Sequence, residues 1–495
     1  MLVASNRGPV SFGFAADGSL TSRRGGGGMV SGMMSGLTAA ARQDDVLWIC
    51  AALSDADRAV ARQDPGAARA GGEAPVRMLD IPPVMFTEAY NGVANSVLWF
   101  THHLLFDTPN QPRFGPGFRR QWASYAAYNE TFAAALAEEA AAAALPPASV
   151  LIQDYHLALA PRLLRNTRPD ARIAHFSHTP WAPPDYYRLL PDDVARAVLD
   201  GILGADRAGF LARRWAGAFL DCCEAVLGAE VEREAGRPAA GGCTAGGSAG
   251  GTAGRVTYRG HTTEVAVYPL GVDAPALRAR AREYDVEAHA AALAEATRGR
   301  KLIVRIDRTE LSKNVLRGLA AYRELLVTRP EWRGQVTHLA FAYPSRSELA
   351  EYRAYTERVH ELAREINDEF GTGDWEPLIL DVKDDYPRSL AACRIADVLL
   401  VNPIRDGMNL VAEEGPILSG RGCVLVLSRE AGAAAVLGGD ALVVNPYDVT
   451  ATADALHEAL TMPAAERQRR CAALAATAAS LAPGRWLADQ LSALG

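Results

Sequence analysis

The stretch that most constrains the fold reads Leu302-Ile303-Val304-Arg305-Ile306-Asp307-Arg308-Thr309-Glu310-Leu311-Ser312-Lys313-Asn314. An apolar strand is predicted over Leu302–Ile306, and a helix over Val315–Leu326 follows the polar turn. Backbone N–H groups and the helix dipole converge at such a junction, so parallel α/β sheets bind phosphate there. Arg308 and Lys313 place two positive charges at this junction. We therefore predict that they bind a diphosphate, with a pair of solvated surface charges as the alternative.

Lysine is scarce in this chain, which makes the lysine in the junction informative. The 495 residues include 51 Lys and Arg, of which only Lys301, Lys313 and Lys383 are lysines. An ammonium is a compact point charge, whereas a guanidinium is a planar fork, so the two make different contacts. Lys313 beside Arg308 supplies both kinds of contact to one diphosphate.

Short apolar segments alternate with helical ones through most of the chain. This pattern is typical of βαβ units and parallel sheet. The chain is too long for one open sheet and shows no eightfold regularity, so we expect an α/β fold of two Rossmann-like, doubly wound domains facing each other across a cleft. Long helices are predicted over 119–144 and 348–370. The predicted strands are 149–153, 173–177, 265–269, 302–306, 336–342, 378–380, 398–402 and 423–428.

The boundary between the two domains is expected after the Pro/Gly turn at 268–273, which gives a first domain of 1–273 and a second of 274–480. A helical stretch without strand character is predicted over 275–297. Residues 236–254 are rich in Gly, Ala, Ser and Thr, and we expect them to form a mobile loop because such a composition cannot bury a core. A functional lid is the alternative. A helix is predicted over 215–228, and a hairpin pairs 256–258 with 263–267.

Composition excludes several classes of function. The net charge of −7 argues against a nucleic-acid or anionic-membrane binder, and no apolar run approaches the ~20 residues that span a bilayer. The N-terminus enters a strand at once and lacks signal-peptide anatomy, so we expect a cytoplasmic protein. The seven cysteines are scattered without a C-x-x-C pair, which predicts buried thiols and neither a disulfide framework nor a zinc site.

Polar residues follow several strands of the expected first domain. Asp154 follows the strand 149–153 and His178 follows the strand 173–177, so both are expected at the carboxyl edge of the sheet, where ligands bind. A carboxylate suits sugar hydroxyls because it accepts two hydrogen bonds at once. The alternative is a structural Asp and a core His. The glycine run 25–28, between a strand and a helix, allows close approach to a phosphate or sugar, or is simply a flexible turn.

The second domain carries two further candidates. Arg346 follows the strand 336–342 and offers a bidentate fork for a phosphate. The segment 406–414 follows the strand 398–402: Gly407 allows a tight turn, and a helix is predicted to begin near Asn409, with its N-terminal amides facing the same cleft. Glu414, one turn into that helix, suits a ribose diol. Glu413 is interpreted as a solvated acid of the helix start.

These pieces, taken in order, resemble the trehalose-6-phosphate synthase family of retaining glycosyltransferases. The resemblance covers the chain from end to end and implies a GT-B fold, with the active site between the two domains and the C-terminal helix, 481–495, returning to the first domain. The matching residues are Ser5-Asn6-Arg7, Gly27-Gly28, Tyr90-Asn91 with Trp99, Asp154-Tyr155-His156, His178 with Pro180, Arg308 with Lys313, Ser345-Arg346, and Asp406-Gly407-Met408-Asn409-Leu410-Val411-Ala412 with Glu414.

The resemblance implies a role for each matching position. The implied catalytic residues are Asp154, His178, Arg308, Lys313 and Asp406. The implied donor site comprises Gly27, Gly28, Arg308, Lys313, Asp406, Gly407, Met408, Asn409, Leu410, Val411 and Glu414, with Glu414 on the ribose and the amides of Leu410 and Val411 on the phosphates. The implied acceptor site comprises Arg7, Tyr90, Trp99, Asp154 and Arg346. No acidic pair with metal-ligand character appears at the diphosphate site, so we expect no metal and no other cofactor.

The implied reaction moves glucose from UDP- or GDP-glucose to glucose 6-phosphate and forms α,α-trehalose 6-phosphate. These two small molecules are the expected partners, and a homo-oligomer stays open. Glu413 stands where family members usually have Lys, residues 308–314 replace the commoner Arg-Leu-Asp-Tyr-Ser-Lys-Gly, and 236–254 resembles an insertion. The first two departures leave the donor base open. Rival functions are a pseudo-glycosyltransferase that joins cyclitols, a glycogen-type transferase or phosphorylase, and a non-catalytic sugar-phosphate sensor.

Overall fold

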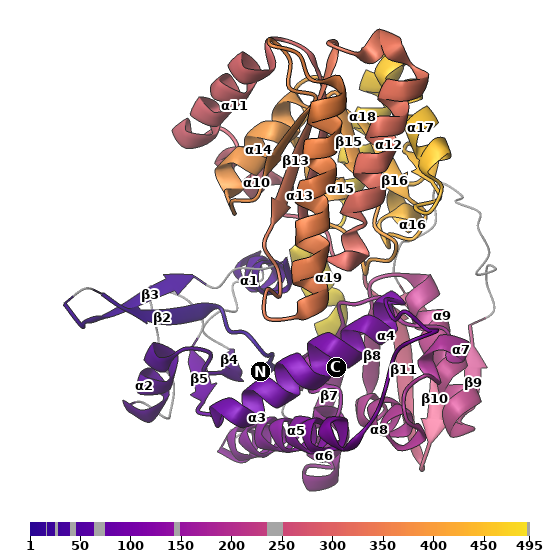
Figure 1. The fold of residues 1–495 in the computed structure, drawn as a ribbon. Coiled ribbons are helices and arrows are strands. Elements are labelled where there is room, and N and C mark those ends of the chain that lie inside the picture. The colour runs from indigo at the N-terminus through magenta and orange to yellow at the C-terminus, as the bar shows by residue number, and fades with distance from the viewer. Residues whose placement is uncertain are drawn as a thin grey trace. The chain divides into compact units, whose positions relative to one another are not determined.

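A computed structural model describes residues 1–15, 17–24, 28–39, 46–63, 75–142, 149–234 and 251–492. The chain divides into two compact units (Figure 1). Unit 1 contains the described residues up to 234 together with 251–270 and 483–492, and unit 2 contains residues 271–482. The two units are described in turn.

Unit 1 is built on a nine-stranded sheet with the order β5-β4-β1-β6-β7-β8-β11-β10-β9. All neighbours from β5 to β11 pair in parallel, and the last two strands are antiparallel. A separate hairpin pairs β2 with β3. The strands are β1 (Leu2–Ala4), β2 (Val10–Phe14), β3 (Leu20–Arg24), β4 (Leu47–Ala51), β5 (Val76–Leu79), β6 (Ser149–Gln153), β7 (Arg172–Ser177), β8 (Arg207–Phe210), β9 (Glu230–Arg233), β10 (Gly251–Tyr258) and β11 (His261–Val267).

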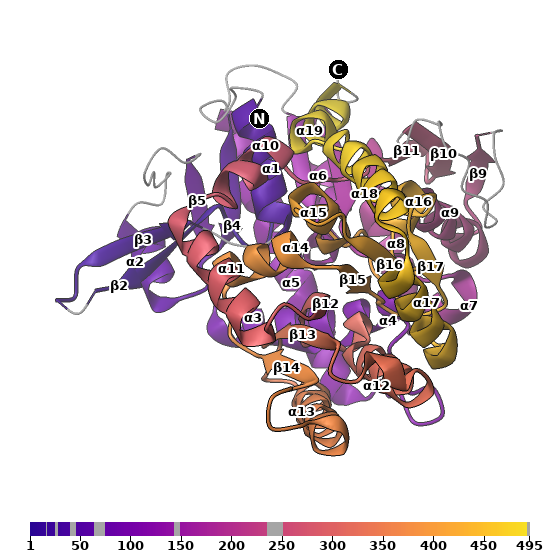
Figure 2. The ribbon, with the colours of Figure 1, turned by 90° about the horizontal axis from the view of Figure 1, so that it is seen from above.

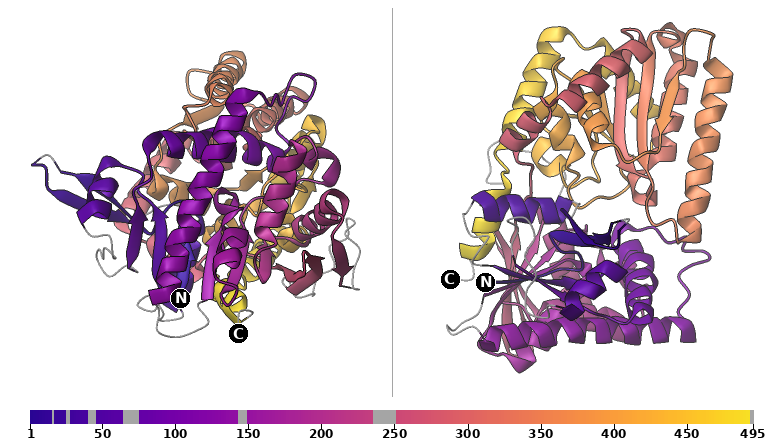
Figure 3. Two further views of the ribbon diagram at one scale, coloured as in Figure 1. Left: turned by 90° about the horizontal axis from the view of Figure 1, so that it is seen from below. Right: turned by 90° about the vertical axis from the view of Figure 1, so that its left-hand side faces the viewer.

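Helices cover both faces of this sheet (Figure 3). The long helix α5 lies on one face, and α1 and α19 pack together on the other, where the rings of Trp486 and Phe176 meet edge-on with centroids 5.1 Å apart. The helices are α1 (Gly28–Ala39), α2 (Asp55–Gln63), α3 (Pro83–Thr87), the π-helix η2 (Glu88–Leu98), α4 (Trp99–His103), α5 (Pro116–Ala142), the 3-10 turn η3 (Tyr155–Leu157), α6 (Ala160–Thr167), α7 (Pro184–Tyr187), α8 (Asp192–Ile202), α9 (Arg213–Cys222), the π-helix η4 (Cys223–Leu227) and α19 (Pro483–Ser492).

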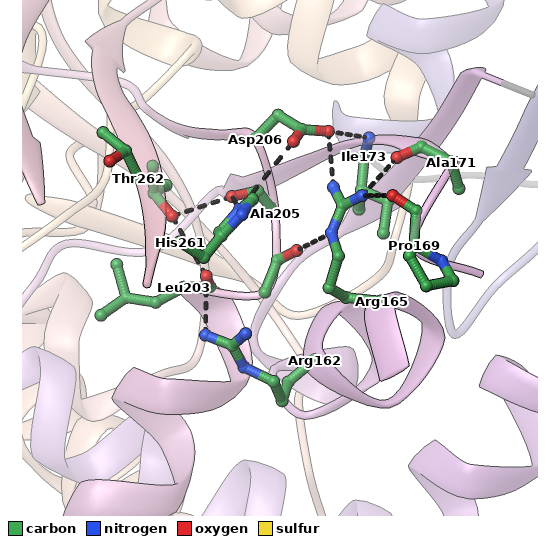
Figure 4. Close-up of polar contacts among 12 residues, drawn as sticks. Arg162, Arg165, Pro169, Ala171, Ile173, Leu203, Ala205, Asp206, His261 and Thr262 are labelled. Atoms are coloured by element: carbon green, nitrogen blue, oxygen red, sulfur yellow. Dashed lines mark hydrogen bonds and ion pairs between the residues drawn. The ribbon is translucent and has the colours of Figure 1, made fainter. Parts of the chain in front are cut away.

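A polar network joins α6 to the amino ends of β7 and β8 (Figure 4). Arg165 binds the Asp206 carboxylate at 2.7 Å and the carbonyl of Ala171 at 2.7 Å, and the same carboxylate accepts from the Ile173 amide at 2.7 Å. Arg162 donates to the Leu203 carbonyl at 2.9 Å. The network satisfies backbone groups at the amino ends of β7 and β8. Open α/β sheets bind ligands at the opposite, carboxyl edge.

Unit 2 is a six-stranded, wholly parallel sheet with the order β14-β13-β12-β15-β16-β17. Side chains alternate between its two faces: Leu302, Val304 and Ile306 enter one core, and Ile303 enters the other. The strands are β12 (Lys301–Arg308), β13 (Val336–Tyr343), β14 (Leu378–Asp381), β15 (Val398–Val401), β16 (Val424–Ser428) and β17 (Leu442–Val444).

The two cores of unit 2 are closed by different sets of helices (Figure 2). Helices α10, α11, α14, α15, α16 and α18 contribute to the first core, and α12, α13 and α17 to the second. Their bounds are α10 (Ala274–Arg280), α11 (Tyr284–Thr297), η5 (Leu311–Lys313), α12 (Val315–Thr328), η6 (Pro330–Trp332), α13 (Ala350–Phe370), α14 (Tyr386–Ile395), α15 (Val411–Leu418), α16 (Ala434–Leu437), α17 (Val449–Thr461) and α18 (Ala464–Ala479).

The first and last residues of unit 2 are joined to each other. The Gly271 amide donates to the Leu481 carbonyl at 2.9 Å. A Cβ atom on Gly271 would lie 2.6 Å from that carbonyl oxygen, so the close approach requires glycine. Both ends of this unit therefore lie at one place.

The expected α/β class with parallel sheet in both units is confirmed. The expected loop over 236–254 is wrong at its end, because 251–254 belong to β10; its remaining positions 236–250 lie outside the described residues. Gly254 pairs with Arg233 of β9, and this position requires glycine because a Cβ atom would lie 2.4 Å from the Glu232 carbonyl oxygen. The stretch 275–297 forms two helices, and 215–228 changes from α to π geometry. No helix in the described ranges is long and apolar enough to cross a membrane.

Candidate active site

The carboxyl edge of the unit 2 sheet gathers the predicted diphosphate residues. β12 lies between β13 and β15, so the loops that follow these three strands leave the sheet side by side. Arg308 is the last residue of β12, and the loops carry Lys313 after β12, Arg346 after β13 and Asp406 after β15. The predicted charged residues of the second domain therefore share one sheet edge.

Lys313 is held by a carboxylate. Its Nζ lies 2.6 Å from Asp406 Oδ2, and both side chains are about one-sixth exposed, at 15% and 17%. Burial lowers the pKa of Lys313, but the charges of Asp406, Asp307 and Glu310 outweigh it and raise the pKa above its usual value. Asn409 Nδ2 donates to the same Asp406 oxygen at 3.1 Å. Lys313 is thus a fixed cation at this edge.

Glu310 is completely buried and contacts both candidate arginines. Its Oε1 lies 2.9 Å from Arg308 Nη1 and 2.8 Å from Arg346 Nη1, and it accepts from Ser345 Oγ at 2.9 Å. Burial raises the pKa of Glu310, but Arg308, Arg346 and Lys313 lower it further, to about 2. The carboxylate is therefore ionised. The sequence drew attention to Glu310 only as a departure from the family pattern; an acid between Arg308 and Lys313 was the available signal.

Arg305 stabilises the turn that carries Lys313. This buried guanidinium binds Asp307 Oδ2 at 2.7 Å and the Lys313 carbonyl at 3.0 Å. Asn314 follows with φ of 59° and ψ of 40°, and its Nδ2 donates to the carbonyls of Asn402 and Pro446 at 2.9 and 2.8 Å. Asparagine tolerates this left-handed conformation, which explains how it replaces the commoner glycine. Arg305 was not identified from the sequence.

The segment after β15 leads into α15, which begins at Val411, two residues later than predicted. Met408 is buried, and the Asp406 backbone pairs with the 430–432 segment. Leu410 is the N-cap of α15 and Val411 begins its first turn, where helical N–H groups have no intrahelical partner. Glu414 lies in this turn, and burial raises the pKa of its carboxyl to about 7.

Glu413 is not solvated, so our interpretation of this residue is wrong. It is 0% exposed, and its Oε2 accepts a hydrogen bond from the Val272 amide at 3.1 Å. Burial raises the pKa of Glu413 well above its usual value. Because α15 packs against α10 and α18, its two adjacent glutamates have different surroundings: Glu413 lies in the core and Glu414 lies at the sheet edge. Glu413 supports the first residues of unit 2, and its neighbour Glu414 is the one that remains partly exposed.

Asp154 and His178 lie together at the carboxyl edge of the unit 1 sheet, where β6 and β7 are neighbours. Asp154 Oδ1 accepts from the His178 amide at 3.1 Å. His178 Nε2 lies 2.9 Å from Gln153 Oε1, so the imidazole donates there and its Nδ1 carries the lone pair. Burial, followed by the neighbouring His175, lowers the pKa of His178 to about 3. His178 is therefore neutral and offers an acceptor.

Tyr90 and Trp99 reach this edge through the 3-10 turn that follows Asp154. The Tyr90 ring on η2 stacks on His156, with centroids 5.4 Å apart, and Trp99 lies 5.9 Å from the Tyr155 ring. His156 Nδ1 is 3.8 Å from Asp154 Oδ2. The structure thus brings Tyr90 and Trp99 into one cluster with Asp154, which lies 55 or more positions after them in the sequence.

Arg7 is exposed and follows β1, the other neighbour of β6. Its carbonyl accepts from Ser5 Oγ at 2.6 Å, which fixes the backbone at the strand end. Gly28 begins α1, and Gly27 lies outside the described residues.

Backbone strain concentrates at these two sheet edges. Seven non-glycine residues in the described part of the chain have positive φ, and Asp154 (72°), Asn314 (59°), Arg346 (45°) and Asn409 (87°) are four of them. Such conformations cost about 1–3 kcal/mol and cluster where function requires a fixed geometry. No group of three His, Cys, Asp or Glu in the described ranges is placed to hold a metal ion.

A family profile described as glycosyltransferase family 20 matches residues 1–495. The chain is 30% identical over 478 residues to an α,α-trehalose-phosphate synthase (UDP-forming) of Dictyostelium discoideum, covering 95% of this chain and 59% of the relative. It is 31% identical over 434 residues to a validamine 7-phosphate valienyltransferase of Streptomyces hygroscopicus subsp. jinggangensis, covering 87% and 81%.

Solved structures extend this likeness to the fold. A structure described as trehalose-6-phosphate from E. coli bound with UDP-2-fluoro glucose matches with a TM-score of 0.81 at 27% identity, covering 100% of this chain and 98% of that one. The chain spans little more than half the length of the first curated relatives it matches. On the family profile, which extends over the whole sequence, the chain belongs to glycosyltransferase family 20.

Proposed function

We propose that this protein is a retaining glycosyltransferase that moves glucose from a nucleoside diphosphate glucose to glucose 6-phosphate and forms α,α-trehalose 6-phosphate. The observation that carries the proposal is the cluster of Arg308, Lys313 and Arg346 at one sheet edge of unit 2. Both substrates bring phosphate groups, and this cluster supplies fixed cations for them. The named activity of the Dictyostelium relative supports the same reaction.

On the donor side, Arg308 and Lys313 would bind the diphosphate, and the first-turn amides of α15 at Leu410 and Val411 would add backbone donors. Charge that develops on the leaving diphosphate would be stabilised by groups already in place. Glu414 would accept from the ribose diol, and two such hydrogen bonds favour the carboxylate form that burial disfavours. Asp406, Gly407, Met408, Asn409, His178, Gly27 and Gly28 complete the proposed donor and glucose contacts.

On the acceptor side, Arg7, Tyr90, Trp99 and Arg346 would bind the phosphate of glucose 6-phosphate, and Asp154 would bind its sugar hydroxyls. His178, neutral and with a lone pair on Nδ1, would accept a hydroxyl hydrogen of the transferred glucose. The acceptor hydroxyl would attack from the face that the diphosphate leaves, with a phosphate oxygen as the base.

The experiment is incubation of the protein with glucose 6-phosphate and either UDP-glucose or GDP-glucose, with products resolved by mass and NMR. We expect a disaccharide phosphate with both anomeric carbons in the α configuration. Comparison of the two donors decides the base. Absence of a disaccharide phosphate with either donor contradicts the proposal.

A second candidate is favoured by the likeness to the valienyltransferase, of which the chain covers 81%. In this case the same clamp would act on a nucleotide-activated cyclitol, and a phosphorylated cyclitol would be the acceptor. Turnover with a cyclitol donor together with none with glucose donors would identify this function.

A further inference from the structure

Glu310 occupies an unusual position for a buried carboxylate. Its side chain is 0% exposed, yet its Oε1 contacts two arginines, Arg308 at the end of β12 at 2.9 Å and Arg346 in the loop after β13 at 2.8 Å. Both contacts use the Nη1 atom of the arginine, so the two guanidinium groups lie side by side at one oxygen. Like charges at this separation repel, and the shared carboxylate offsets the repulsion.

The backbone fixes this carboxylate more firmly than the Arg308 side chain is fixed. The Thr309 amide donates to the Tyr343 carbonyl at 2.6 Å, and Thr309 Oγ1 donates to the Ala342 carbonyl at 2.9 Å. These bonds lock the residue before Glu310 to the end of β13, from which the Arg346 loop leaves. The Arg308 side chain, in contrast, is 53% exposed. Glu310 is therefore the fixed element, and Arg308 takes its direction from it.

Each arginine contacts Glu310 through one end of its guanidinium group. A guanidinium has five N–H donors in a fixed fork, and these contacts use the Nη1 end of each. A residue that holds one end of the planar guanidinium group also sets the direction of its other N–H groups. This direction affects phosphate binding, because arginine binds phosphate in a specific bidentate geometry.

We infer that Glu310 is a positioning residue that aligns Arg308 toward the donor diphosphate and Arg346 toward the acceptor phosphate, so that one carboxylate orders the phosphate contacts of both substrates. This inference rests on the proposed function for the identity of the two ligands. It assigns Glu310 no contact with either substrate. Glu310 affects the donor through Arg308 and the acceptor through Arg346, and these two effects can be tested separately.

The test is a set of four variants, Glu310→Gln, Glu310→Asp, Arg346→Ala and the double variant Glu310→Gln with Arg346→Ala. Binding of UDP-glucose and of glucose 6-phosphate is measured by calorimetry, and turnover is measured where it occurs. Glu310→Gln should lower the affinity for both ligands by about tenfold or more, which is the contribution of one charge-assisted contact. Glu310→Asp keeps the charge and should recover part of both affinities, and it also serves if the Gln variant does not fold.

The double variant gives the decisive result. In the Arg346→Ala background, Glu310→Gln should lower the affinity for glucose 6-phosphate by less than about twofold further, because the arginine through which Glu310 acts on that ligand is already absent. The affinity for UDP-glucose should still fall by about tenfold. The matched control is Glu348→Gln, which removes an exposed carboxylate from the same loop as Arg346 and should change neither affinity.

Two outcomes overturn the inference: unchanged affinity for both ligands in folded Glu310→Gln, or further losses in the double variant that are equal for both ligands. A purely structural role would lower the melting temperature and the active fraction without changing either dissociation constant. Failure of the proposed function is separate, because it would appear in the wild type, as absence of the disaccharide phosphate, whereas failure of this inference would appear only in the comparison of the variants with the wild type.

Discussion

Lys313 Nζ and Asp406 Oδ2 lie 2.6 Å apart at the carboxyl edge of the unit 2 sheet, one from the loop after β12 and the other from the loop after β15. The two side chains are partly buried and are neighbours only because β12 and β15 pair in parallel. Asp406 holds the ammonium in place, and this contact uses one of the three N–H donors of Lys313.

Replacement of Lys313 tests its role with the donor. Lys313→Ala should lower turnover with a nucleoside diphosphate glucose by more than about tenfold, since a charge-assisted contact to a diphosphate contributes roughly 1.5–3 kcal/mol. Lys313→Arg should also be impaired, because a planar fork cannot replace a point charge at this turn. Steady-state kinetics measures both, and circular dichroism checks the fold. Near-normal activity in both variants would show that Lys313 does not bind the donor and is only a surface charge.

Arg346 is expected to recognise the acceptor phosphate. Arg346→Ala should lower kcat/KM for glucose 6-phosphate by about tenfold to a hundredfold, the value of one or two lost charge-assisted bonds. The much smaller rate with free glucose should hardly change, because glucose has no phosphate for Arg346 to bind. Rates with the two acceptors are compared in one assay. Equal proportional losses with both would show that Arg346 does not recognise the phosphate.

His338 should make stability depend on pH. Burial, followed by the charge of Arg305, lowers the pKa of His338 from 6.5 to about 3. Between these values the unfolded chain binds a proton that the folded protein does not, so this residue costs stability as pH falls, by about 1.4 kcal/mol per pH unit. Neither ring nitrogen has a hydrogen-bond partner within the described residues. Leucine therefore removes the titration without breaking a hydrogen bond.

The expected result is a difference in slope. From pH 6.5 to pH 5, the free energy of unfolding of His338→Leu should fall by about 2 kcal/mol less than that of the wild type, as measured by urea titration. The exposed His360 on α13 provides a matched control. Parallel pH profiles for wild type and His338→Leu would contradict the prediction. Comparison with the wild type is necessary because Glu414, with its pKa raised to about 7, acts in the opposite direction between pH 4.5 and 7.

Asn314 separates backbone conformation from side-chain hydrogen bonds. Asn314→Gly keeps the left-handed backbone and loses the two bonds to the Asn402 and Pro446 carbonyls and the bond that Oδ1 accepts from Arg317, so it should destabilise by about 1–2 kcal/mol. Asn314→Ala loses the bonds and also strains φ, which should add about 1 kcal/mol or more. Denaturant unfolding of the three proteins measures both steps. If the alanine variant were as stable as the glycine variant, the φ of 59° would carry no cost.

Strand positions in the parallel sheets could be predicted from the sequence. The strand 149–153 matches β6 residue for residue, because a buried parallel strand is a short apolar run bounded by polar residues. The turn after β12 was predicted as a phosphate site for the same reason, since its charges directly follow such a run. These predictions depend on local pattern alone.

Features that depend on tertiary packing could not be predicted from the sequence. Glu413 and Glu414 are chemically identical neighbours, and only the packing of α15 separates a buried acid from a partly exposed one. The π geometry of η2, which carries Tyr90, leaves no clear periodicity in sequence. Glu310 matters through two arginines, one of them 36 positions away, and this relationship exists only once β12 and β13 pair.

The bond between Gly271 and Leu481 has a practical consequence for protein engineering. Since the first and last residues of unit 2 meet, residues 271–482 are in effect one continuous insertion into the chain of unit 1, with both junctions at a single point. Such a segment can be exchanged through two adjacent joints without redesign of a long linker. Chimaeras that carry the corresponding segment of a UDP-forming relative would then show which half of the molecule chooses between uracil and guanine.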